Sequence, residues 1–269
     1  MAQRYSQSLS RHQTRGEILE LTPAPLLILF AVAFLSGSIN SVAGGGSFLT
    51  FPALMFTGVP PISANATNNF AMWFGTLASA RGYREEVREQ RHLLVNAAIL
   101  SLLGSLIGAM LLLHTPSRTF QRMIPFLLLF ATIVFAISPF LTQQHSGAAK
   151  RHTPVQLLAQ FLTAIYGGYF GAGIGFLMLA ILAFSGLPNF NAMNAVKNVL
   201  AAVINGVALI PFILAGIIQW PQAIVMALGA LLGGYIGARI GRRIPSRLMR
   251  AGVIAIGLSM AIYFFLHAN

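Results

Sequence analysis

The stretch AGGGSFLTFPALMFTGVPPISANATNN, residues 43–69, places glycines, hydroxyls and amides between two apolar segments. Three glycines at 44–46 open a short apolar segment, and the turn at 58–61 closes it. A polar cluster then precedes another apolar run, and it contains Ser63, Asn65, Thr67, Asn68 and Asn69. An unpaired polar group in hydrocarbon is costly, so polar side chains in such a place usually line a cavity or bind a ligand.

A second copy of this pattern lies at GAGIGFLMLAILAFSGLPNFNAMNAVKN, residues 171–198. Here Gly-Leu-Pro at 186–188 corresponds to Gly-Val-Pro at 58–60, and Lys197-Asn198 corresponds to Thr67-Asn68 after a small insertion. Two clearer matches follow. LLGSLIGA at 102–109 matches LLGGYIGA at 231–238, and Pro-Ser-Arg at 116–118 matches Pro-Ser-Arg at 245–247. In both matches, the two copies are separated by the same number of residues in the sequence. Several matches in one order predict two homologous halves.

The composition is that of an integral membrane protein. Of the 269 residues, 56% are hydrophobic and 8% are charged, with a mean hydropathy of +0.75, whereas about a quarter of the residues in a soluble domain are charged. The net charge of +12 does not indicate nucleic acid, because most arginines lie in short loops at the ends of apolar runs. All five acidic residues are glutamates outside the apolar runs, and the chain has no cysteine.

The predicted fold is all-α, with two inverted repeats. We expect a polar tail at 1–22, a first repeat at 23–141, a linker at 142–153 and a second repeat at 154–269. The elements expected in the two repeats are 25–42, 47–57, 62–80, 93–113 and 123–141, then 154–171, 175–185, 194–218, 221–240 and 251–266, with a charged loop at 81–92. Because each repeat has an odd number of elements, the second should be upside down relative to the first, so that the short, hairpin-like segments meet near the midplane.

Glycines and arginines give two further expectations. Small residues at four-residue spacing let helices approach closely, so we interpret six glycines as packing residues: Gly104, Gly108, Gly229, Gly233, Gly237 and Gly241.

The arginines at 81–91 and those at 239–250 should share one side of the membrane, which we take as cytoplasmic. The three arginines of the N-terminal tail conflict with that orientation.

Lys197 is the most informative charged residue, because it follows the start of a long apolar segment. Either it extends its ammonium to the membrane interface, or it supplies the positive charge of an anion site. Asn68 and Asn198 either donate to that anion or act as helix caps and interhelical hydrogen-bond partners. The glycine runs either form tight turns or present free backbone N–H groups to an anion at a helix N-terminus.

An intramembrane enzyme has little support. The six histidines lie at loops or ends without a metal-ligand spacing, and no serine–histidine–acid set can be assembled. We therefore expect no catalytic residue, no metal and no cofactor. Without an intramembrane acid, coupling would need a cation held by carbonyl, Asn or Thr oxygens, or a substrate that carries its own proton; uncoupled passage is also open.

The motifs AGGGSFLTFPAL, Gly-Val-Pro and ANATN, repeated as GAGIGFLMLAIL, Gly-Leu-Pro and NAVKN, resemble the sulfite exporter TauE/SafE family. The resemblance covers about residues 24–266. It implies a multi-pass transporter of the bacterial inner (plasma) membrane that moves sulfite or organosulfonates such as sulfoacetate. The positions that match the family pattern are Gly44, Gly45, Gly46, Thr67, Asn68, Gly173, Lys197 and Asn198, whereas Ile174 stands where a third glycine would fall.

We therefore predict a substrate site at the repeat interface, formed by Gly44, Gly45, Gly46, Thr67, Asn68, Asn69, Gly173, Asn194, Lys197 and Asn198. The expected partners are a small anion, the lipid bilayer and a coupling ion, either H⁺ or Na⁺. A homodimer is left open, and no nucleic acid is expected. The alternatives are a channel-like permease for another small anion or solute, an intramembrane enzyme, and a membrane scaffold protein.

Overall fold

The structure is a computed structural model that describes residues 23–142, 154–187, 189–240 and 246–267. These residues form helices joined by turns, which confirms the all-α prediction: α2 (Pro23–Val42), α3 (Ser47–Phe56), α4 (Pro61–Gly82), α5 (Arg84–Glu89), α6 (Arg91–His114), α7 (Ser117–Thr142), α8 (Pro154–Tyr169), α9 (Ile174–Leu182), α10 (Phe190–Leu214), α11 (Trp220–Ile240) and α12 (Ser246–His267). The predicted tail at 1–22 and nearly all of the predicted linker at 142–153 lie outside the described residues.

Four helical stretches of the described chain are long and apolar enough to cross a membrane. They are Pro23–Val42, Leu94–His114, Phe190–Leu214 and Trp220–Ile240. The two short elements are also present, since α3 has 10 residues and α9 has 9. Because a helix rises only a small distance with each residue, neither of them can span a bilayer, which takes about 20 residues.

Local sequence explains where several helices begin. Pro61 follows Pro60 and occupies the first turn of α4, where its missing N–H has no cost. The side chain of Asn189 caps α10 by accepting from the Ala192 N–H at 2.9 Å. The prediction of a loop over 81–92 is wrong for most of the stretch, because α4 runs to Gly82, α6 begins at Arg91 and α5 forms between them. Helix α5 has acids in its first turn and a base in its last, a pattern that suits the helix dipole.

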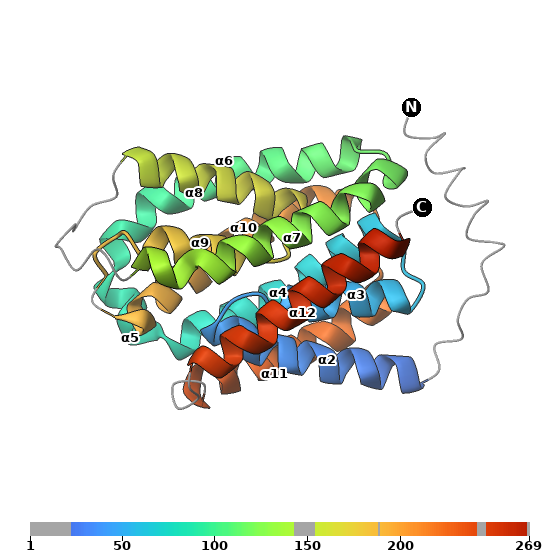
Figure 1. Cartoon of the computed structure of the whole chain (residues 1–269), viewed down its shortest axis with the longest axis horizontal. Helices are drawn as coiled ribbons and strands as arrows, with labels where there is room; N and C mark the ends of the chain where they lie inside the picture. The colour runs from blue at the N-terminus through green and yellow to red at the C-terminus, as the bar shows by residue number, and fades with distance from the viewer. Residues whose placement is uncertain (1–22, 143–153, 188, 241–245, 268–269) are drawn as a thin grey trace.

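Helices far apart in the sequence lie side by side in the bundle. In Figure 1, α2 runs along α11, and α6 runs along α8 on the opposite side of the molecule. Helices α4 and α10 pack against each other between these pairs, and α7 packs against α12. The short helices α3 and α9 lie inside this arrangement, where most of their residues are buried.

The glycine stripes are packing surfaces, as predicted. A Cβ on Gly104 would lie 2.7 Å from the Phe161 carbonyl oxygen of α8, and one on Gly233 would overlap the Phe34 carbonyl oxygen of α2. Such contacts with a neighbouring helix backbone also occur at Gly108, Gly229 and Gly237, whereas Gly241 lies outside the described residues. Each glycine therefore sets the distance between two helix backbones.

We expect Gly233→Ala to destabilise the protein by about 1–3 kcal/mol, because the added methyl group forces α2 away from α11. Gly252→Ala is the matched control, since a Cβ at Gly252 in α12 would meet nothing within 4 Å. Thermal unfolding of the purified protein in detergent checks this. Equal stability of the two variants would contradict the packing role of Gly233.

Arginines from distant segments gather at one end of the bundle. Arg81, Arg84 and Arg239 line a cleft of about 390 Å³ together with Glu85 and Glu86. Arg239 also lies 4.5 Å from the centre of the Tyr235 ring. These three arginines therefore share one side of the molecule, as the sequence predicts.

Candidate functional site

The two glycine loops contact each other at the start of the short helices. A Cβ on Gly44 would lie 2.9 Å from the carbonyl carbon of Gly175, and one on Gly45 would overlap the Phe176 ring. Gly44 and Gly173 have φ angles of +79° and +82°, which non-glycine residues rarely adopt. Glycine is thus required for the backbone shape and for the close approach of α3 and α9.

Lys197 lies beside this contact and is only 1% exposed. Its Nζ donates to the Asn40 carbonyl oxygen at 2.7 Å and to Asn194 Oδ1 at 2.8 Å. The membrane-interface reading of Lys197 is therefore wrong. An ammonium has three N–H donors, so one of them is left for another acceptor.

No carboxylate balances this charge in the described part of the chain. The glutamates described there, Glu85, Glu86 and Glu89, belong to α5, and both acceptors of Lys197 are neutral oxygens. A buried charge without an opposite charge is costly. The arrangement therefore favours binding of an anion next to Lys197.

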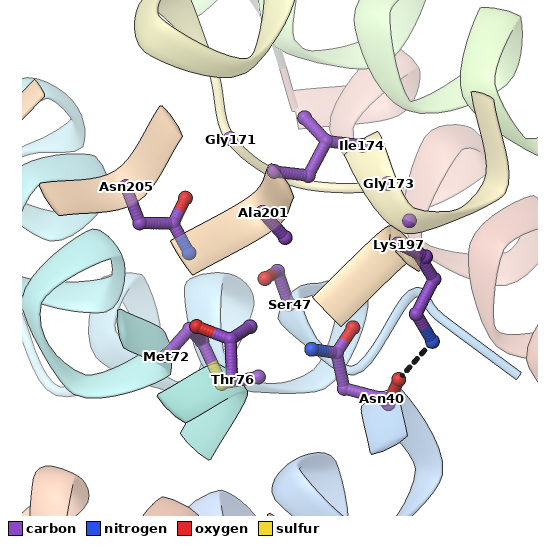
Figure 2. A pocket seen from close by; sticks show the side chains of 11 residues that line it. Asn40, Ser47, Met72, Thr76, Gly171, Gly173, Ile174, Lys197, Ala201 and Asn205 are labelled. Atoms are coloured by element: carbon purple, nitrogen blue, oxygen red, sulfur yellow. Dashed lines mark hydrogen bonds between the residues drawn. The ribbon is translucent and has the colours of Figure 1, made fainter. Parts of the chain in front are cut away.

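A small polar cavity adjoins Lys197. It has about 10 Å³ of free volume, room for about one water molecule, and its lining residues are Asn40, Ser47, Met72, Thr76, Gly171, Gly173, Ile174, Gly175, Lys197, Ala201 and Asn205. Figure 2 shows the Asn40 and Asn205 amides and the Ser47 hydroxyl around this space. These three side chains make no hydrogen bond to other described residues, so they are free to bind a ligand.

Some of the predicted site residues lie at this cavity. Gly173 and Lys197 line it, Asn194 holds the Lys197 ammonium, and Gly44 packs against the lining residue Gly175. The structure therefore brings these predicted residues together at the cavity, and Asn194 contacts the ammonium itself.

The other predicted residues contact neighbouring parts of the protein instead of lining this cavity. Thr67 Oγ1 accepts from the Gln219 N–H at 3.0 Å, Asn68 Oδ1 accepts from the Thr50 hydroxyl, and Asn198 Nδ2 donates to the Ser41 carbonyl at 3.4 Å. A Cβ on Gly46 would overlap the Ser36 carbonyl oxygen. Asn69 lies next to Gly171, with its Nδ2 3.6 Å from the position of a Cβ on that glycine.

Four polar lining residues were not predicted: Asn40, Ser47, Thr76 and Asn205. A sequence signal for two of them exists. Thr76 and Asn205 are separated by the same sequence offset as the clearest repeat matches, and so are the lining residues Met72 and Ala201. Asn40 gave no signal, because its essential contact to Lys197 is made by its backbone carbonyl.

The comparisons with known proteins agree over nearly the whole chain. The family model described as Sulfite exporter TauE/SafE matches residues 29–264. The "Probable membrane transporter protein YfcA" of Escherichia coli (strain K12) is 30% identical over 252 residues, 93% of each chain. The "Probable membrane transporter protein ORF9" of Sinorhizobium sp is 30% identical over 247 residues, 88% of this chain and 91% of that protein. No solved structure matches the chain.

Proposed function

Since the chain belongs to the sulfite exporter TauE/SafE family of membrane transporters, we propose that it carries a small sulfur-containing oxyanion, sulfite or an organosulfonate such as sulfoacetate, across the bacterial inner membrane. The observation that carries the proposal is the buried Lys197 ammonium, which has neutral partners and one N–H left beside a polar cavity. An anion in that cavity would supply the missing negative charge.

The donors around the cavity suit an oxyanion. Charge-assisted hydrogen bonds are stronger than neutral ones, so Lys197 would provide the largest part of the affinity. The amides of Asn40 and Asn205 and the hydroxyl of Ser47 can donate to the remaining oxygens. Thr76 presents lone pairs instead, because its hydroxyl donates to the Trp73 carbonyl at 2.8 Å.

The proposal includes two inverted repeats, at 23–141 and 154–269, and the packing of the helices supports it. In this relation α2 corresponds to α8, α11 to α6, α3 to α9 and α12 to α7. Helix α2 contacts α11, and their counterparts α8 and α6 also contact each other; likewise α3 contacts α12, and α9 contacts α7. The close glycine contacts correspond in the same way: Gly233 of α11 packs against Phe34 of α2, and Gly104 of α6 packs against Phe161 of α8. A pseudo-twofold axis through the contact of α4 with α10 accounts for these correspondences.

A constant sequence offset corrects the register between the halves. Asn-Ala-Thr-Asn-Asn at 65–69 matches Asn-Ala-Val-Lys-Asn at 194–198 without an insertion, at the offset of the clearest repeat matches. In this register Asn68, rather than Thr67, is the counterpart of Lys197. Thr67 faces Gln219 in the structure, which agrees with a different role. The proposed anion site is therefore asymmetric, with a single fixed charge on one side of the axis.

The size of the cavity favours a carrier over a channel. Its free volume of about 10 Å³ is far below that of an oxyanion with several heavy atoms. The anion can therefore enter only when one repeat moves against the other, as in alternating access. An open channel would need a continuous polar path.

Uptake into proteoliposomes tests this function. We expect saturable uptake of sulfite or sulfoacetate, and counterflow, in which unlabelled anion inside accelerates the entry of labelled anion. Sulfate serves as the comparison anion. Non-saturating flux without counterflow would support a channel, and no flux of any of the three anions would contradict the proposed substrate class.

A further inference from the structure

Gly171 lines the anion cavity (Figure 2), and the small space where its side chain would lie is bordered by polar atoms. Gly171 has a φ angle of +73°, which favours glycine, so only a hydrogen stands where other residues carry a Cβ. The three heavy atoms nearest to that position are Gly167 O at 3.4 Å, Asn69 Nδ2 at 3.6 Å and Asn65 Oδ1 at 4.0 Å. All three are polar, which is unusual for a gap between buried helices.

The amides at this space are buried and incompletely paired. Asn65 is 0% exposed, and its Nδ2 donates to the Tyr169 carbonyl at 3.1 Å, which leaves Oδ1 without a partner. Asn69 is 2% exposed, and neither atom of its amide has a partner. Since nothing fixes the Asn69 amide, it can turn its oxygen into the space.

The end of α8 adds a backbone oxygen. In a continuing helix the Gly171 N–H would donate to Gly167 O, but it donates to the Tyr166 carbonyl at 3.4 Å. Gly167 O therefore has no backbone partner among the described residues. The C-terminal end of a helix carries partial negative charge, which favours a cation.

The surroundings of the Lys197 ammonium show that a backbone carbonyl and an amide oxygen near a helix end can hold a cation. Its ammonium is held by the Asn40 carbonyl, near the end of α2, and by Asn194 Oδ1. In the other half, Asn65 is the counterpart of Asn194 in the register without an insertion. When the starts of α3 at Ser47 and α9 at Ile174 are aligned, Asn40 corresponds to Gly167. The two oxygens that hold the ammonium thus have their counterparts beside Gly171.

The cation itself has no counterpart in the other half. Asn68 occupies the position that corresponds to Lys197, and its side chain turns to Thr50. We propose that a monovalent cation of the Na⁺ type binds beside Gly171, between Asn65 Oδ1, Asn69 Oδ1 and Gly167 O. Neutral oxygens are the ligands that hard cations accept, whereas Ca²⁺ and Mg²⁺ favour sites with carboxylates and transition metals favour imidazole or thiolate.

This inference deepens the proposed function and rests on its repeat relation, because it identifies a coupling ion. Gly171 lines the anion cavity as well as the cation space, so a bound anion would have the cation on one side and Lys197 on the other. Each ion would then raise the affinity for the other by the same factor.

Binding of radiolabelled Na⁺ to the purified protein in detergent tests the site without any transport. We expect saturable binding of one ion per chain, competed by unlabelled Na⁺ and not by choline. Asn69→Ala removes a ligand and Gly171→Ala fills the space, so each should weaken binding at least about tenfold. Gly216→Ala is the matched control, since Gly216 has a φ angle of +66° and open space around it, and it should bind as the wild type does.

Two more variants separate this site from the anion site. Lys197→Gln should keep Na⁺ binding although it loses anion transport, so failure of the proposed substrate would leave the cation result standing. Asn68→Lys supplies a tethered ammonium at the counterpart position and should abolish Na⁺ binding. Absence of saturable Na⁺ binding in the wild type, or wild-type binding in Asn69→Ala, would overturn the proposal, because water would then fill the space.

Discussion

Lys197→Gln is expected to lower the rate of anion uptake at low substrate concentration roughly 100-fold, the effect of removing one partner from a buried charge interaction. The glutamine can still donate to the Asn40 carbonyl or to Asn194 Oδ1, which now hold the ammonium. The protein should therefore keep its stability while it loses the one charged side chain among the described residues that line the cavity. Proteoliposome uptake and thermal unfolding, measured on the same preparation, check both parts.

Arg122→Gln is the matched control, because it removes an equal charge from an exposed position on α7. Its uptake should equal that of the wild type. Lys197→Arg keeps the charge but needs more room than the small cavity offers, so it should transport poorly as well. Normal uptake by Lys197→Gln would contradict the anion site and leave Lys197 as a structural residue.

Much of the fold could be predicted from the sequence, because apolar runs and glycine positions have direct physical consequences for helices and turns. Apolar runs of about 20 residues predict spans, since hydrocarbon requires every backbone group to be paired within the helix. Glycines at four-residue spacing predict close helix pairs, and Gly104 and Gly233 confirm it. The glycine loops predict sharp bends, and the positive φ angles of Gly44 and Gly173 confirm those.

The candidate site was predicted less completely, for two physical reasons. Thr67 and Lys197 were paired through an insertion, and a shift by one residue turns a helical side chain by about 100° to another face. Thr67 consequently faces the α10–α11 connection, where it accepts from Gln219. Asn40 was missed because a backbone carbonyl carries no residue-specific signal.

The asymmetry of the site has a direct consequence for transport. Under the proposed repeat relation, the positions at the ends of α2 and α8 correspond, and each has a carbonyl and an amide oxygen nearby. Among the described residues at these two positions, Lys197 supplies a covalently attached cation at one of them. A fixed ammonium cannot leave, whereas an ion beside Gly171 can. In the proposed cycle the fixed charge selects the anion, and the exchangeable charge couples its movement to a gradient.

Asn205→Asp is expected to abolish anion uptake, by roughly 100-fold or more, without loss of stability. Asn205 and Lys197 line the same small cavity, so a carboxylate at position 205 would supply internally the negative charge that the substrate otherwise brings. The variant changes the side chain very little in size. Because the new carboxylate offsets the charge of the buried ammonium across the cavity, the thermal stability should stay close to that of the wild type, and stabilisation by added anion should disappear.

Two comparisons identify the cause of this loss. Asn205→Ala removes the amide without adding charge, so it should reduce uptake only about tenfold, the value of one hydrogen bond to a charged group. Combining Asn205→Asp with Lys197→Gln leaves an unpaired carboxylate in the cavity and should lower the thermal stability, whereas either change alone should not. Unfolding curves of the four proteins in this cycle measure the coupling between the two positions. A coupling of zero, with uptake by Asn205→Asp near that of Asn205→Ala, would show that the ammonium does not face the cavity where the anion binds.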